Sequence, residues 1–207
     1  DTDEVSVPQT VRQLQHVALS MHRDATTELA SGPVDTYDMG RDDQADRLAA
    51  MVDRSFARGL ARLEDVDSLN LTRTELFELW RTSQELERVA DHAAAIARLY
   101  ANHDLEFGQE LGDTVEDIGA LARETITDAV AVVLADKDVA AVHDAFRTRD
   151  RVRERTDAVV GRFANTDDRD WPVTAVLHHL RRTAEHGGNI AEVGLGRSIR
   201  ADEEPES

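Results

Sequence analysis

Small and apolar residues recur at alternating steps of three and four between residues 76 and 100. This spacing lines them up on one side of an α-helix and predicts a single buried stripe. Two carboxylates, Glu87 and Asp91, lie one position round from the stripe and one helical turn apart. Because like charges beside a buried stripe repel each other and lose hydration, these side chains are the first candidates for a functional role.

The same periodicity runs through the rest of the chain, and no strand pattern competes with it. The expected helices cover residues 9–30, 42–63, 72–102, 111–133, 138–164 and 171–197. The prediction is an all-α fold of two tandem antiparallel three-helix bundle repeats, a spectrin-like six-helix arrangement. The repeats cover residues 9–102 and 103–197, residues 1–8 form a linker, and residues 198–207 form a disordered acidic tail.

Two adjacent glycines, Gly187 and Gly188, lie within the last expected helix. Each costs about 1 kcal/mol relative to alanine in a helix. Their presence predicts a close approach between helices; the alternative is room for a bound ion or a partner's side chain.

A short motif occurs once in each half of the chain. The first copy reads Glu87-Arg88-Val89-Ala90-Asp91-His92, and the second contains His186 and Asn189-Ile190-Ala191-Glu192. Placing His92 over His186 aligns Asp91 with Glu185, Ile96 with Ile190 and Ala97 with Ala191. The chain therefore reads as two copies of one helical unit.

This motif resembles the signature of the PhoU-type phosphate-uptake regulators, in which it lies on the third helix of each of two three-helix repeats. The present chain departs from it at Ala95, where Asn is usual, and at Arg181, where Glu is usual. The resemblance implies a non-enzymatic cytoplasmic regulator of phosphate uptake or signalling. Its implied partners are the ATPase of a phosphate ABC transporter and a sensor kinase, and a homodimer is expected. Some members hold metal clusters on acidic motifs of these helices.

The composition narrows the class of partner. A net charge of −18 disfavours nucleic acid and anionic membranes as partners of this segment. Lys137 is the single lysine among 24 basic residues, which resembles the cytoplasmic proteins of salt-accumulating halophiles. The chain has no cysteine, no signal peptide and no apolar run long enough to span a membrane.

Two groups of carboxylates are candidate metal ligands. In the first unit, Asp46 and Asp53 on the second expected helix face Glu87 and Asp91 on the third, if these helices pack antiparallel. In the second unit, the matching residues are Asp150, Glu154 and Glu185. Oxygen-rich sites of this kind suit divalent or ferric ions, with iron, zinc, magnesium or nickel as candidates. The competing interpretations are a solvated acidic face in the first unit and an ion-pair network around Arg181 in the second.

The histidines are weaker candidates. His92 and His186 occupy matching places and are interpreted as packing or hydrogen-bonding residues, whereas His143 and His178 could serve as ligands. No Asp or Glu lies three residues before any histidine, and no phosphate-binding loop or nucleophile motif occurs, so no enzyme is predicted. The alternatives to a regulator are a metal-storage bundle, a bare structural repeat, or the sensor or dimerisation part of a transcriptional regulator with an N-terminal DNA-binding module.

Overall fold

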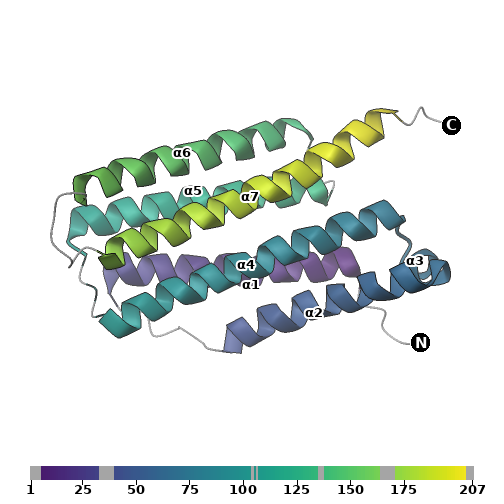
Figure 1. Ribbon diagram of the computed structural model, residues 1–207, viewed down its shortest axis with the longest axis horizontal. Helices are drawn as coiled ribbons and strands as arrows, with labels where there is room; N and C mark the ends of the chain where they lie inside the picture. Colours follow the sequence, from purple (N-terminus) through teal and green to yellow (C-terminus); the bar gives the residue numbers. More distant parts are fainter. Residues whose placement is uncertain are drawn as a thin grey trace.

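A computed structural model describes residues 6–32, 40–103, 105, 107–134, 138–163 and 171–203 of the chain. Within these residues the secondary structure is helical and no strand occurs. The helices are α1 (Val7–Ser31), α2 (Gly40–Ala61), α3 (Leu63–Ser68), α4 (Arg73–His103), α5 (Gln109–Val133), α6 (Ala140–Phe163) and α7 (Trp171–Glu203) (Figure 1). The all-α prediction is confirmed.

Most helix ends differ by one or two residues from the predicted ones, and three differences involve buried or paired side chains. The first helix begins at Val7, inside the predicted linker, because Val7 is buried in the core. The predicted polar turn after the second helix contains the short helix α3, whose Val66 also packs into the core. Helix α7 continues to Glu203, so residues 198–203 of the predicted tail are helical. Residues 33–39 and 165–170, which fall between predicted helices, lie outside the described residues, as do residues 204–207 of the predicted tail.

Ion pairs explain why α7 extends beyond its predicted end. Arg197 Nη2 lies 3.1 Å from Glu75 Oε1, and Arg197 Nη1 lies 3.4 Å from Glu78 Oε2. Arg200 also pairs with Glu78. Because Glu78 is buried at the start of α4, these arginines offset the cost of desolvating its charge and hold the last turns of α7 against α4.

Local sequence signals set the helix ends. Thr72 and Glu75 form a reciprocal capping box before α4: the Glu75 amide donates to Thr72 Oγ1 at 3.1 Å, and the Thr72 amide donates to Glu75 Oε2 at 2.9 Å. Gly32 follows α1 with a φ of 87°, a conformation that glycine adopts without strain. Both signals lie where the sequence predicted a helix start and a helix stop.

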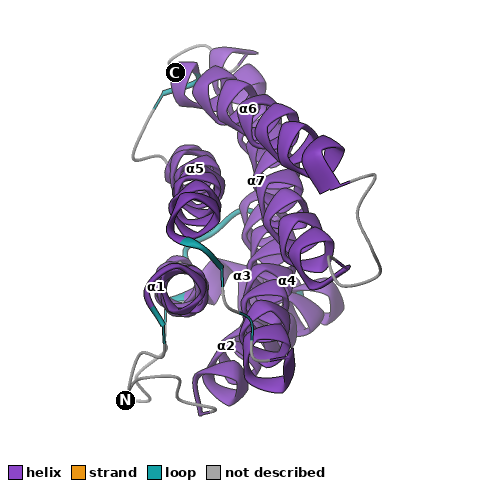
Figure 2. Ribbon diagram, turned by 90° about the vertical axis from the view of Figure 1, so that its left-hand side faces the viewer, coloured by secondary structure: helices purple, strands orange, loops and turns teal. Residues whose placement is uncertain are grey.

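The six long helices form two units that pack through equivalent helices. Helices α1, α2 and α4 contact one another, as do α5, α6 and α7. Between the units, α1 packs against α5 and α4 packs against α7, whereas α2 and α6 lie at opposite ends of the molecule (Figure 2). Each of the two central pairs runs antiparallel (Figure 1). The units are therefore related by an approximate twofold axis across the helices.

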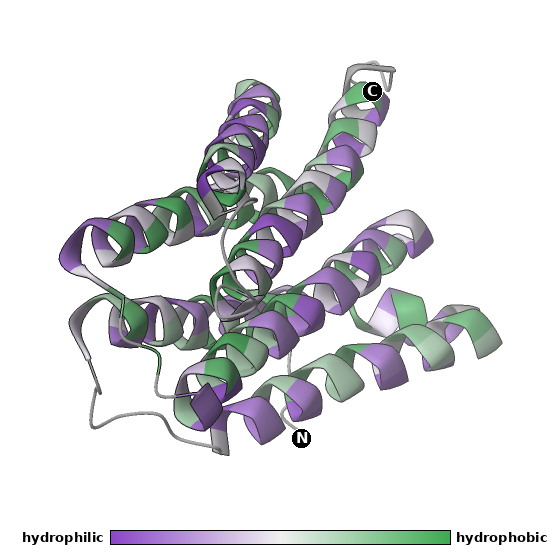
Figure 3. Cartoon of the chain, turned by 60° about the vertical axis from the view of Figure 1, so that its left-hand side comes forward, coloured by the Kyte–Doolittle hydropathy of each residue, from purple (hydrophilic) through white to green (hydrophobic). Residues whose placement is uncertain are grey.

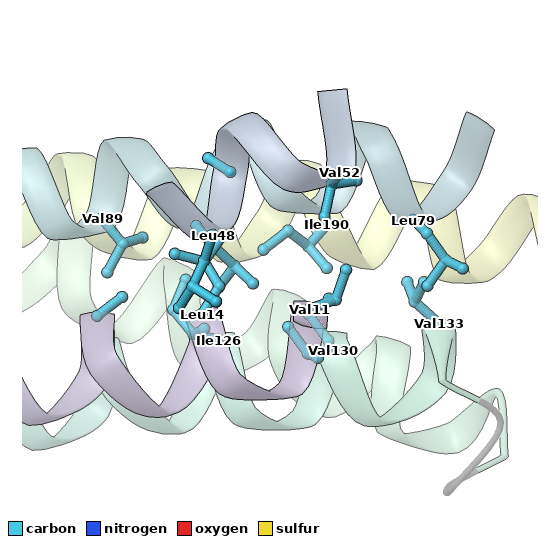
Figure 4. Packing of buried hydrophobic residues seen from close by; sticks show 14 of the residues in the cluster. Val11, Leu14, Leu48, Val52, Leu79, Val89, Ile126, Val130, Val133 and Ile190 are labelled. Carbon is cyan, nitrogen blue, oxygen red and sulfur yellow. The ribbon is translucent and has the colours of Figure 1, made fainter. Parts of the chain in front are cut away.

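One apolar core joins the two units. Side chains from α1, α2, α4, α5 and α7 meet in the cluster shown in Figure 4. Leu14, Leu86, Ile126 and Ile190 are fully buried there. Every long helix carries both hydrophobic and hydrophilic residues along its length, as Figure 3 shows. Because aromatic residues make up only 4% of the chain, alanine, valine and leucine do most of the packing and the helices lie close together.

The paired glycines of α7 mark two such close approaches. A Cβ added to Gly187 would lie 2.6 Å from Thr125 Cγ2 on α5. A Cβ added to Gly188 would lie 2.9 Å from Arg149 Cδ on α6. The predicted role of these residues in helix packing is therefore confirmed, and Gly188 makes room for an arginine side chain.

Candidate functional site

The predicted acidic residues of the first unit face one another across α2 and α4. Burial raises the pKa of Glu87, and the charges of Asp91, Asp46 and Asp53 raise it further. Burial also raises the pKa of Asp91, followed by the charges of Asp42 and Asp46. The charges of the four residues that the sequence singled out, with Asp42 as a fifth, thus act on one another. We call this set of side chains the acidic groove.

The acidic groove does not present a ready-made metal site. Asp53 Oδ1 accepts hydrogen bonds from Trp80 Nε1 at 2.7 Å and from Gln84 Nε2 at 3.1 Å. Within the described ranges, no group of three or more histidine, aspartate or glutamate side chains is placed to hold a metal ion. The carboxylates therefore repel one another, but in their present positions they do not form a set of ligands for a metal ion.

The candidates of the second unit are divided between two places. Glu185 Oε1 accepts from Arg181 Nε at 3.2 Å, and Arg182 also pairs with Glu185. Arg181 Nη1 reaches Asp157 at 3.1 Å, and Asp150 accepts from Arg149 Nη2 at 2.9 Å. The ion-pair interpretation thus describes Glu185 better than the metal interpretation, because its carboxylate oxygens are occupied by guanidinium groups.

Asp150 and Glu154 lie apart from Glu185. They line a cavity of about 540 Å³ between α5 and α6, together with Arg147 and Arg151. Acidic and basic side chains are therefore mixed in this cavity. His143 and His178 are exposed, and neither joins a group of potential metal ligands among the described residues.

A chain of polar side chains crosses the contact between α4 and α7. His186 Nδ1 lies 2.7 Å from Glu85 Oε2, which also accepts from Asn189 Nδ2 at 3.0 Å. His92 Nε2 lies 3.2 Å from His186 Nε2, and His92 Nδ1 lies 3.0 Å from His179 Nδ1. We call Glu85, His186, His92 and His179 the histidine chain.

One set of protons satisfies every bond of the histidine chain. With Glu85 ionised, His186 donates from Nδ1 to Glu85 and accepts at Nε2 from His92. His92 then accepts at Nδ1 from His179. All three rings are neutral in this arrangement. It agrees with the pKa of His92, which burial and then the neighbouring His186 and His179 lower to about 4.

Glu85 keeps its charge although it is buried. Burial acts to raise its pKa, but the hydrogen bonds from His186 and Asn189 outweigh burial, and the pKa is lowered. The result is a buried carboxylate from the first unit held by two side chains from the second. This contact fixes the register of α4 against α7.

The histidine chain follows the internal repeat. The alignment of His92 with His186 also places Glu85 over His179. The Glu85–His186 and His179–His92 contacts are thus equivalent under the approximate twofold axis. The predicted hydrogen-bonding role of His92 and His186 agrees with these contacts. His179 and Glu85 were not singled out from the sequence, although extending the alignment by seven residues pairs them.

A second buried network joins α1 to α5. Arg123 Nη1 donates to Thr26 Oγ1 at 2.9 Å and lies 3.3 Å from His22 Nδ1, while Arg123 Nη2 lies 2.9 Å from Glu116 Oε1. Burial and then the charge of Arg123 lower the pKa of His22 to about 3. Both helix pairs between the units therefore combine an apolar core with specific polar contacts.

Acidification should weaken the fold through His92. Unfolded His92 takes up a proton near pH 6.5, whereas folded His92 resists it down to about pH 4. The unfolded state thus binds more protons between these values, and the free energy of unfolding falls as the pH drops through this window. We expect the His92 ring to titrate near pH 4 by NMR, and His92→Gln to reduce the fall in urea midpoint between about pH 7 and about pH 5.

His16→Gln serves as the control because His16 is exposed on α1. This variant should keep the wild-type pH dependence, and part of the slope should survive in His92→Gln because His22 is also held neutral. Titration of His92 close to pH 6.5 would show that this ring is not held buried and neutral within the histidine chain.

Comparison with known proteins finds one matching domain model and a similar solved structure. Residues 11–100 match the family model of the PhoU domain. The crystal structure of PhoU from Pseudomonas aeruginosa matches with a TM-score of 0.70 and 18% sequence identity, covering 94% of this chain and 96% of that one. No curated protein sequence matches the chain. Among the described residues, none of the helices is long and apolar enough to cross a membrane. The predicted resemblance is thus confirmed: residues 11–100 match the PhoU domain, and the chain has the fold of PhoU over nearly its whole length.

Proposed function

We propose that this protein is a non-enzymatic, cytoplasmic regulator of phosphate uptake that acts by binding other proteins. The match of residues 11–100 to the PhoU domain is the observation that carries the proposal. The two-unit fold supports it, because it extends the likeness to PhoU beyond the matched residues. The partners we propose are the ATPase of a phosphate ABC transporter and a sensor kinase, with a homodimer as the acting form.

A partly exposed aromatic cluster on the first unit is a suitable surface for such a partner. Phe56 and Trp80 stack with ring centroids 4.4 Å apart, and Phe77 lies 5.8 Å from Trp80. Phe77 is 43% exposed, and Leu60 on the same pair of helices is 70% exposed. Aromatic side chains are enriched at the centres of protein interfaces, where they contribute much of the binding energy. Asp53 of the acidic groove binds Trp80 and lies beside this cluster.

Deletion of the gene should raise phosphate uptake in phosphate-rich medium, and the wild-type gene should restore repression. Phe77→Ala should fail to restore it and should lose co-purification with the transporter ATPase, because an aromatic anchor is removed. Ile199→Ala is the matched control, since Ile199 is 51% exposed on α7. Unchanged uptake in the deletion strain would contradict the proposal.

A divalent cation bound in the acidic groove is a second proposal. The raised pKa values of Glu87 and Asp91 favour it, because a cation would relieve the repulsion among these carboxylates. Oxygen donors suit hard cations such as magnesium, or iron. The side chains would have to move together to provide three ligands.

Metal analysis of protein purified without chelator tests this second proposal. We expect a bound divalent ion in the wild type and its loss in the Glu87→Gln/Asp91→Asn double variant. Glu124→Gln removes an exposed carboxylate from α5 and should keep the ion. Metal-free wild-type protein that also takes up no added magnesium, iron, zinc or nickel would show that the acidic groove is a solvated surface.

A further inference from the structure

A cavity in the second unit is lined by four arginines. It has a volume of about 350 Å³ and lies between α6 and α7. Its lining residues are Arg149, Arg153, Arg181, Arg182, Glu185 and Asn189. Guanidinium groups so close together repel one another, and the cavity holds only one carboxylate among its lining residues. We call it the arginine cavity.

The arginine cavity occupies the position of the acidic groove in the other repeat. The alignment of His92 with His186 places Glu87 over Arg181 and Asp91 over Glu185. Superposing the buried Val52 of α2 on the buried Val152 of α6 places Asp53 over Arg153. Two carboxylates of the first unit are thus replaced by two arginines in the second. At these two aligned positions the charge changes sign between the repeats, whereas Asp91 and Glu185 both remain acidic.

The second unit also makes specific room for Arg149. The two alignments place Ala49 over Arg149 and Ala94 over Gly188. Both alanines are buried, and a Cβ on Gly188 would lie 2.9 Å from Arg149 Cδ. Compared with the first unit, α6 therefore has the larger Arg149 in place of alanine, and α7 has the smaller Gly188 in place of alanine. Arg149 thus lies against α7 at Gly188, and its guanidinium carbon is 5.1 Å from the centroid of the Phe146 ring on α6.

The carboxylates near the arginine cavity do not occupy all the N–H donors of its arginines. Arg149 donates from Nε and Nη2 to Asp150, and Arg182 donates from Nη1 to Glu185. Arg181 donates from Nε to Glu185 and from Nη1 to Asp157. No ion pair joins Arg153 to any carboxylate of the described chain, and this side chain is exposed at the cavity. Each guanidinium carries five N–H donors, so several remain available.

The arginines of the cavity stabilise the charged form of Glu185. Burial acts to raise the pKa of Glu185, yet the hydrogen bonds and charges of Arg182 and Arg181 outweigh burial and the pKa is lowered. In the acidic groove the aligned Asp91 has a raised pKa. The overall charge of −18 opposes an anion at long range, but salt screens this repulsion beyond about 8 Å at physiological ionic strength.

From these observations we propose that the arginine cavity binds a small tetrahedral oxyanion. Planar guanidinium forks recognise such oxyanions by paired N–H···O bonds, and arginine is the side chain most suited to this recognition. The identification of the anion as inorganic phosphate rests on the proposed function, whereas the anion site itself rests on the cavity alone.

One lining residue connects the arginine cavity to the contact between the units. Asn189 lines the cavity and donates to Glu85, the buried carboxylate of the histidine chain. Its side-chain amide is therefore a reporter that an anion in the cavity should shift. Asn189 also lines a cavity with Arg81 and Arg200, so the shift is interpreted together with the Arg153 and Arg151 variants below.

Calorimetric titration of inorganic phosphate into the full chain, at fixed ionic strength, tests the proposal. We expect saturable binding, accompanied by an NMR shift of the Asn189 side-chain amide. Arg153→Gln should weaken binding at least about tenfold, because a charge-assisted partner is lost. Arg151→Gln is the matched control: it removes the same charge from the same helix but lines the other cavity, so its affinity should equal that of the wild type.

Parallel titrations separate the sources of the oxyanion. Tighter binding of phosphate than of sulfate and of glycerol phosphate supports free phosphate as the ligand. Tighter binding of glycerol phosphate would overturn that choice in favour of a phosphate ester. Absence of saturable binding of any of the three, or equal weakening by Arg153→Gln and Arg151→Gln, would overturn the anion site. A chain that binds no phosphate but still represses uptake would leave the proposed function intact.

Discussion

The contact of Glu85 with His186 and Asn189 is the interaction on which the relation of the two repeats depends. A carboxylate in the α4–α7 contact loses much of its hydration, and the two side chains from the other repeat replace it. Apolar packing between alanine- and valine-rich helices is favourable in more than one register, because small side chains offer similar surfaces along the helix. A buried charge with defined partners is satisfied in only one register, since displacement would leave it unpaired.

The approximate twofold axis explains why some aligned residues of the two repeats are alike and others differ. On the axis, equivalent residues meet each other, and His92 therefore contacts His186. Away from the axis, equivalent positions face solvent in separate grooves and are free to diverge. The first unit keeps carboxylates at Asp53 and Glu87, whereas the second places Arg153 and Arg181 at the aligned positions. The residues at the axis are constrained by the fold, and the grooves give the two halves of the protein different chemistry.

Periodicity predicted the six long helices, because each helix carries one buried stripe that must meet another, and the motif repeated at His92 and His186 predicted the two repeats. Periodicity also placed Asp46, Asp53, Glu87 and Asp91 in one groove, since their positions follow from helix spacing and antiparallel packing. Periodicity missed α3, because a single buried residue, Val66, gives no recognisable pattern. It also missed the extension of α7, which depends on ion pairs from Arg197 to Glu75 and Glu78 on α4. Glu85 and His179 were overlooked because a buried ion–histidine contact depends on a partner in the other repeat.

A double-mutant cycle between Glu85 and His186 tests most directly whether this contact joins the repeats. The free energy of unfolding would be measured by urea for the wild type, Glu85→Ala, His186→Ala and the double variant near neutral pH. We expect each single variant to lose about 3 kcal/mol and the pair to show a coupling energy above about 1 kcal/mol. A coupling energy within about 0.3 kcal/mol of zero would mean that the two residues act independently, and that apolar packing alone sets how the repeats fit together.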